Sequence, residues 1–278
     1  MAEGWEGWDE YAPFYDWENA QTLGRRDVPF WQRLAASVDG PILELGCGTG
    51  RVTFPVARDG AHIIGIDRSH AMLARAVTRK RRLRKKADID LVRGDIRHLP
   101  FPDRTFRLVM APYGILQSLL RERDLAATLE AVARVLTRDG VFGLELVADL
   151  PSWDEYKKRV SLRGKRAGGS HISLIESVRQ DRAKRLTIFE QEFVERPSTH
   201  AGRGIKTQRR TFTLTFRTLS VAQMVKRLEK AGFEVSALLG DYQGGPWDPR
   251  ADVWIIVARR QPAKKQEKAW TVSGPGVR

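Results

Sequence analysis

Three glycines stand close together in the segment Glu44–Gly50, between a short apolar run and a helical pattern. Gly46, Gly48 and Gly50 let the backbone approach a ligand where side chains would block it. Asp67 ends the next apolar run, the position from which an acidic side chain accepts hydrogen bonds from ribose hydroxyls. The pattern predicts an adenosine-bearing ligand at the carboxyl ends of two strands.

The residues around the glycines decide between such ligands. A dinucleotide fingerprint, Gly-x-Gly-x-x-Gly, requires its third glycine where this chain has Arg51. Glu44 lies two residues before the first glycine, where its carboxylate would repel a pyrophosphate but suits a cationic ligand. S-adenosylmethionine (SAM) carries a sulfonium, an ammonium and no phosphate. Glu44 and Asp67 together therefore favour SAM over NAD.

On these residues the chain resembles the class I SAM-dependent methyltransferases of small-molecule type, from about residue 11 to 260. The glycine loop would pack against the methionine part of SAM, and Asp67 would hold the ribose. Arg68 and Met72 would flank the adenine, and Asp95 and Ile96 would contact its edge. The alternatives are a turn-capping role for Asp95 and a core role for Met72. The matching segments are Ile42–Val52, Ile64–Ser69 with Met72-Leu73, Gly94–Arg97, Arg134–Gly140 and Ala231–Phe233.

The resemblance also gives the aromatic N-terminus a role. In related enzymes an N-terminal helix closes over the cofactor and a tyrosine meets its carboxylate. Tyr15 is the first candidate and Tyr11 the second, with hydrophobic packing as the alternative for both. The predicted cofactor-binding residues are Tyr15, Glu44, Gly46, Cys47, Gly48, Gly50, Asp67, Arg68, Met72, Asp95, Ile96 and Ala111.

The acceptor side is less clearly marked. Ala111–Gly114 follows the fourth strand, where this family places residues facing the reacting methyl group, and Tyr113 is the candidate for the acceptor pocket. Ala111 replaces the polar residue that DNA and glutamine amine methyltransferases carry there. No residue stands out as a general base, and methyl transfer can run on proximity and alignment. The five histidines are scattered, so we expect no metal site.

Nearly continuous apolar strands alternate with amphipathic helices from residue 41 to 147, which predicts an α/β fold with a seven-stranded, mostly parallel Rossmann-like sheet covered on both faces. Three further strands follow without helices, at 172–181, 185–196 and 207–217, and predict an inserted antiparallel meander. The predicted parts are an N-terminal helical cap (1–40), the SAM-binding domain (41–161 and 218–260), the insert (162–217) and a disordered tail (261–278).

The amino-acid composition limits the cellular compartments and the classes of binding partner to consider. The chain has 42% hydrophobic and 29% charged residues, no apolar run of membrane-spanning length and no secretory signal pattern. One cysteine, Cys47, points to a reducing cytoplasm. The net charge of +14 is concentrated in Arg79–Lys86. That run indicates either a solvated helix end or a surface for nucleic acid.

The sequence therefore predicts transfer of the SAM methyl group to an O, N or C nucleophile of a small molecule. One rival keeps the chemistry and makes RNA or protein the acceptor, because of the basic run. The other is a SAM-binding module without catalysis. The insert either covers the acceptor pocket or forms a homodimer interface. Its apolar residues, such as Phe212 and Phe216, must pack on something, and the aromatic N-terminal segment offers a partner at the same edge, which favours the cover.

Overall fold

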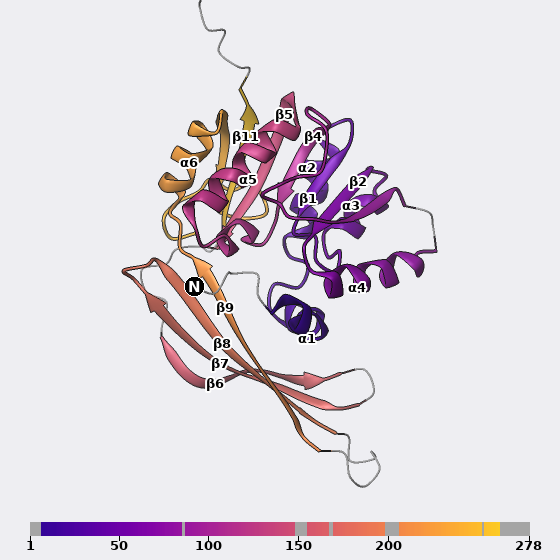
Figure 1. Ribbon diagram of the computed structural model, residues 1–278, viewed down its shortest axis with the longest axis vertical. Helices are drawn as coiled ribbons and strands as arrows, with labels where there is room; N and C mark the ends of the chain where they lie inside the picture. Colours follow the sequence, from indigo (N-terminus) through magenta and orange to yellow (C-terminus); the bar gives the residue numbers. More distant parts are fainter. Residues whose placement is uncertain are drawn as a thin grey trace, which may run out of the picture.

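The computed structural model describes residues 7–84, 87–147, 155–166, 169–197, 206–251 and 253–261, which form two β-sheets and the helices around them (Figure 1). The larger sheet has seven strands and the smaller has four. The predicted α/β class, with a mostly parallel seven-stranded sheet and an antiparallel insert, is confirmed. Among these residues, no helix has the length and apolar character needed to cross a membrane.

The seven-stranded sheet has the order β10-β11-β5-β4-β1-β2-β3. Within it β11 runs antiparallel to both neighbours, and the other pairs are parallel. β5 begins at Leu136, and its register against β4 shifts between Leu136 and Val141. The strands are β1 (Ile42–Leu45), β2 (Ile63–Asp67), β3 (Ile89–Arg93), β4 (Phe106–Ala111), β5 (Leu136–Val147), β10 (Phe233–Leu239) and β11 (Val253–Arg260).

Helices cover both faces of this sheet, because its strands are apolar on both sides. One core joins the sheet to α2, α3 and α4, and the other joins it to α5 and α6. Ser69 caps α4 by accepting a hydrogen bond from the Met72 N–H at 3.1 Å, and Ser220 caps α6 similarly. The helices are α2 (Val28–Ala36), α3 (Thr53–Arg58), α4 (His70–Arg81), the short 3₁₀ helix η1 (Ile115–Ser118), α5 (Glu122–Val135) and α6 (Val221–Lys230).

The four-stranded antiparallel sheet, order β6-β7-β8-β9, stands between β5 and α6 in the chain. The sequence predicted three strands, and β6 (Tyr156–Lys165) is the additional one. It is an edge strand, exposed over most of its length. Its first residue, Tyr156, is followed by the basic residues Lys157, Lys158 and Arg159, so the alternation that marks a strand is missing. Residue 162, the predicted start of the insert, falls inside β6. The other strands are β7 (His171–Asp181), β8 (Leu186–Arg196) and β9 (Gln208–Arg217).

Helix α1 (Trp8–Gln21) lies between the two sheets and contacts both parts of the protein (Figure 1). Its apolar side packs on the insert, where the rings of Phe14 and Phe193 stack with centroids 4.4 Å apart. Its polar side is tied to α4 by an ion pair between Asp16 and Arg75 at 3.2 Å. The N-terminal helix therefore joins the insert to the larger sheet.

Candidate functional site

The glycine loop connects β1 to α3, and its three glycines all have positive φ, which favours glycine. A Cβ on Gly46 would lie 2.6 Å from the side chain of Ile115, and one on Gly50 would overlap the ring of Phe54. These two glycines are therefore required for packing within the protein. A Cβ on Gly48 would meet nothing closer than 4.0 Å. Gly48 is the glycine that leaves room for a ligand beside the loop.

Asp67 ends β2 with its carboxylate against this loop. Its Oδ2 accepts a hydrogen bond from the Gly48 N–H and its Oδ1 accepts one from the Ser69 N–H, each at 2.8 Å. Burial raises the pKa of Asp67, and these backbone N–H groups oppose that effect. Because each carboxylate oxygen retains a second acceptor position, the fixed Asp67 side chain can receive two neighbouring hydroxyls of a ribose.

Glu44 lies on β1 immediately before the loop and is only 3% exposed. Its Oε2 accepts a hydrogen bond from the hydroxyl of Thr53 at 2.5 Å. Burial raises the pKa of Glu44 to about 8, although the Thr53 hydrogen bond and the Arg51 guanidinium both lower it. A cation bound nearby would favour the ionised carboxylate, so the charge of Glu44 depends on the ligand.

Arg51 follows the loop and organises the other end of the site. Its guanidinium makes a bidentate pair with the completely buried Asp27, with Nη2 2.7 Å from Oδ2. It also lies over the ring of Tyr113, 5.5 Å from the centroid. Burial raises the pKa of the Tyr15 phenol, and the nearby positive charge of Arg51 lowers it. Arg51 therefore brings together the two tyrosines that the sequence assigned to the site.

Tyr113 follows β4 with a φ of 54°, a left-handed conformation that is strained for any residue except glycine. Its N–H donates to Oε2 of Glu145 at 3.0 Å, and the Tyr242 hydroxyl donates to Oε1 of the same carboxylate at 2.9 Å. Burial raises the pKa of Glu145 to about 7. Tyr113 is nevertheless 39% exposed. The buried carboxylate thus holds a strained backbone while the tyrosine ring remains accessible.

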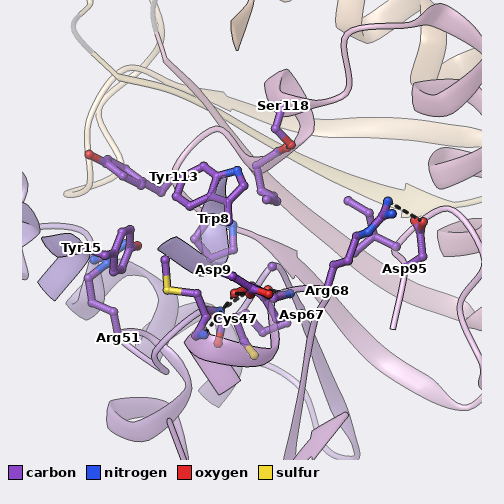
Figure 2. Close-up of a pocket in the computed structure, with 18 of the residues that line it drawn as sticks. Trp8, Asp9, Tyr15, Cys47, Arg51, Asp67, Arg68, Asp95, Tyr113 and Ser118 are labelled. Carbon is purple, nitrogen blue, oxygen red and sulfur yellow. Dashed lines mark hydrogen bonds and ion pairs between the residues drawn. The ribbon is translucent and has the colours of Figure 1, made fainter. Parts of the chain in front are cut away.

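These groups line one cavity of about 330 Å³, within the size range of small-ligand pockets. Figure 2 shows Tyr15 and Tyr113 at one end, Arg68 and Asp95 at the other, and Trp8 between them. The structure therefore gathers most of the predicted residues around a single space. Those that line it are Tyr15, Glu44, Gly46, Cys47, Gly48, Asp67, Arg68, Met72, Asp95, Ile96 and Tyr113.

Two predicted cofactor residues do not line the cavity. Gly50 is used in packing, as described above, and Ala111 is completely buried at the end of β4. Tyr11 is also turned away, because it is buried and its hydroxyl donates to Glu18. Of the two tyrosines considered for the cofactor, Tyr15 is the one that faces the cavity.

Met72 and Asp95 each have a structural role and also line the cavity. Met72 is buried in the core shared with α1, and it also lines the cavity. Asp95 caps its turn by accepting a hydrogen bond from the Arg97 N–H at 3.0 Å, and it pairs with the Arg97 guanidinium at 2.7 Å. Its remaining contact with the cavity is compatible with the predicted adenine-edge role.

Several lining residues were not assigned from the sequence, because their partners are distant in the chain. Asp9 of α1 accepts a hydrogen bond from the Ser69 hydroxyl and one from the Ala71 N–H at 3.2 Å, so one helix caps another. No local pattern marks such a contact. For Phe216 the alternation of β9 was a usable signal. The unassigned lining residues are Gly7, Trp8, Asp9, Glu10, Arg51, Val52, Ser69, Arg93, Gly94, Pro112, Ile115, Ser118, Leu119 and Phe216.

The basic run lies outside this cavity, and part of it serves the fold. Arg79 donates to the carbonyl oxygen of Thr49 at 3.0 Å and to Asp16 at 3.3 Å, and Lys80 donates to the carbonyl oxygen of Ile89. Lys85 and Lys86 lie outside the described residues. The exposed members among the rest are Arg81, Arg82 and Arg84.

Comparison with known proteins agrees with this geometry. Residues 42–140 match the family model described as "Methyltransferase domain". The cypemycin N-terminal methyltransferase of a Streptomyces species is 28% identical over 83% of this chain and 88% of its own length. The 2-phytyl-1,4-naphtoquinone methyltransferase of Synechococcus elongatus is 36% identical, over 46% of this chain and only 56% of its own length.

Solved structures extend the likeness to nearly the whole chain. An S-adenosylmethionine-dependent methyltransferase from Clostridium acetobutylicum has a TM-score of 0.71 at 17% identity, over 91% of this chain and 99% of that one. The sugar N-methyltransferase KedS8 from a Streptoalloteichus species has the same TM-score and identity, over 91% and 93%. At these identities the likeness establishes the fold.

Proposed function

We propose that this chain, which belongs to the class I SAM-dependent methyltransferases, transfers the methyl group of SAM to an amine nitrogen of a small-molecule acceptor. The observation that carries the proposal is the single cavity, in which the cofactor residues Gly48 and Asp67 continue into the tyrosine-lined end at Tyr15 and Tyr113. Both reactants of a direct transfer must meet in one such space.

The residues present fit SAM. Gly48 leaves open the volume that a Cβ would fill, and the fixed Asp67 carboxylate suits a ribose. Arg68 stands at the opposite end for the adenine, and Met72 and Ile96 line the same cavity. Tyr15, beside Arg51, is available to the carboxylate of the cofactor. This assignment of individual residues is part of the proposal.

Carboxylates outnumber guanidinium groups at the tyrosine end, and this supports a cationic acceptor. Asp27 already pairs with Arg51, and Glu44 and Glu145 are two further buried carboxyls beside it that a bound cation would ionise. An amine is the acceptor whose protonated form gains from that balance. The N-terminal methyltransferase among the relatives acts, by its name, on an amine as well.

Ala111 stands where methyltransferases of DNA and glutamine amines carry a polar residue, and this difference favours an aliphatic amine as the acceptor. The amines of DNA bases and of glutamine are planar, because they share their lone pair with an aromatic ring or a carbonyl group, and a polar side chain beside the nitrogen helps to free that lone pair. An aliphatic amine has a localised lone pair once it has lost its proton, so it does not need that partner.

The reaction would depend on positioning. Bound SAM would supply a methyl group on a cationic sulfur: an acceptor amine that has lost its proton to solvent could take the methyl group with its lone pair, while the sulfur would leave as the neutral thioether of S-adenosylhomocysteine. Arg51 and Glu145 hold Tyr15 and Tyr113 at that end of the cavity, and α1 and Phe216 enclose it. Such enclosure aligns the reactants, which can account for a large part of the rate without a general base.

We propose that the insert is the roof of the acceptor end. Phe216 of β9 lines the cavity, and the aromatic face of β8 and β9 packs on α1. The alternative of a homodimer interface concerns the opposite face of the same sheet. Measuring the oligomeric state of a variant with substitutions on that face separates the two roles.

Nucleic acid as the acceptor has weaker support, because Arg79 and Lys80 are engaged within the protein. If RNA were the partner through the exposed arginines of the run, its affinity would fall steeply with salt. Cys47 is buried and fits a reducing compartment, so we propose the cytoplasm as the location, testable by fractionation.

The test of the function uses SAM labelled on its methyl group with a panel of small amines, each paired with the hydroxyl compound of the same skeleton. The expected result is label in amine products and not in the hydroxyl partners. Label in hydroxyl or carbon products would keep the methyltransferase and overturn the amine assignment. Replacing Tyr113 with Ala should reduce transfer while SAM still binds.

A further inference from the structure

The two chain connections between the insert and the larger sheet meet at one side chain, Gln117 of η1. The chain leaves the larger sheet at Val147, the last residue of β5, and returns from β9 at Arg217. Oε1 of Gln117 accepts a hydrogen bond from the Val147 N–H at 2.7 Å. Its Nε2 donates to the carbonyl oxygens of Val147 and Arg217, each at 3.2 Å. A single amide therefore holds both connections.

Only an amide side chain can make this set of contacts. A carboxylate could accept from the Val147 N–H but could not donate to either carbonyl oxygen, and an apolar side chain could do neither. Gln117 is 4% exposed, so an unmade contact would not be replaced by water at little cost. Gly114 leaves the space: a Cβ there would lie 2.8 Å from Oε1 of Gln117 and 3.1 Å from Val147 Cγ2.

The segment 114–119, which contains η1 and Gln117, also forms part of the cavity wall. Ile115, Ser118 and Leu119 line the cavity on either side of Gln117, and Phe216 lines it immediately before Arg217. Gln117 itself is not among the lining residues. A change in the angle of the insert would therefore move Phe216 relative to this segment. Gln117 resists this change at the chain connections, in addition to α1 and to the ion pair between Arg217 and Glu122.

We propose that Gln117 is a positioning residue, which fixes the inserted sheet over the acceptor end of the cavity by holding both of its connections with one amide. This inference rests on one part of the proposed function, namely that the insert covers the acceptor end of the cavity. The contacts themselves predict a local mechanical role that can be measured without any acceptor.

The experiment compares hydrogen exchange, by mass spectrometry, in the wild-type protein, Gln117→Met and Gly114→Ala, with calorimetric titration of SAM into each. Gln117→Met removes all three hydrogen bonds at nearly constant volume. Gly114→Ala displaces the amide while leaving it in the chain, and it also strains the backbone, because Gly114 has a φ of 65°. The matched control is Gln208→Met, an exposed glutamine on β9, the strand that ends at Arg217. Because no acceptor is needed, failure of the amine assignment would leave this test unaffected.

Both variants should exchange roughly tenfold faster in segments 141–147 and 208–217, since buried partners lose their hydrogen bonds. Segment 42–67, which carries the glycine loop and Asp67, should keep wild-type exchange, and SAM affinity should not change. Gln208→Met should match the wild type throughout. Unchanged exchange at the two connections, or an equal rise in all segments, overturns the proposal. If Gln117→Met does not fold, the same criteria apply to Gly114→Ala.

Discussion

Glu44 should release a proton when SAM binds. In the ligand-free protein, burial holds the pKa of this carboxyl at about 8. SAM brings positive charge to a site whose nearest acidic group is mostly neutral at pH 7. The bound cofactor should favour the ionised carboxylate, because opposite charges in a buried site stabilise each other.

The raised pKa of Glu44 sets the size of the effect. With a pKa of about 8, roughly nine in ten molecules carry the proton at pH 7, so binding should release close to one proton there. SAM affinity should rise about tenfold between pH 7 and pH 9 and then level off. Folding responds in the opposite sense. Because the pKa is raised above its unfolded value, the ligand-free protein should lose stability as pH rises from about 4.5 to 8.

The measurement is titration calorimetry at pH 7 in phosphate and in Tris, whose different ionisation enthalpies report the number of protons released. Glu44→Gln keeps an acceptor for Thr53 and removes the titrating group, so it also subtracts any proton that SAM itself contributes. Glu18→Gln is the control, because Glu18 is a half-buried acid, with a pKa of about 7, that does not line the cavity. Equal proton release by the wild type and Glu44→Gln would refute the reasoning.

Other substitutions test the remaining parts of the site. Asp67→Ala should weaken SAM binding by about 1–3 kcal/mol, measured by calorimetry, because two ribose hydroxyls lose a charged acceptor. Gly48→Val should abolish SAM binding in a protein that circular dichroism shows to be folded, and NAD should bind neither form. Arg51→Met should lower the free energy of unfolding in urea by about 3–5 kcal/mol, because it leaves Asp27 buried without its partner, and Asp27→Leu in the same protein should restore much of the loss. Replacing residues 156–216 with a Gly/Ser linker should abolish methyl transfer while some SAM binding persists. A monomeric variant with full activity would contradict the proposal that the insert covers the acceptor end.

The cofactor half could be predicted from the sequence because its residues are close together in the chain. Gly46 and Gly48 sit in one loop, and Asp67 ends the next strand of a parallel sheet, so strand order alone brings them together. Gly50 shows the limit of that reasoning. The motif places it in the loop, but whether a glycine faces ligand or protein depends on a side chain such as Phe54.

The acceptor half could not be predicted in the same way. The conformation of Tyr113 depends on Glu145, which is on another strand, and on Tyr242 beyond the insert. Arg51 was noticed because it breaks a dinucleotide pattern, and its pairing with Asp27 gives it a positive role. β6 was missed because an exposed edge strand does not need an apolar face. Each of these depends on distant contacts that no spacing rule encodes.

The charge balance at the tyrosine end connects binding with release. Asp27 neutralises Arg51, and burial leaves Glu44 and Glu145 with raised pKa values, so the ligand-free site is close to neutral. SAM adds a sulfonium charge, which an ionised Glu44 can offset. Methyl transfer removes the sulfonium charge and leaves the ammonium, so one of the two positive charges that favour the ionised carboxylate is lost. The pKa of Glu44 should then rise part of the way back, and the affinity of S-adenosylhomocysteine should depend less on pH than that of SAM. The same buried carboxyl would thus favour the substrate form of the cofactor over the product form.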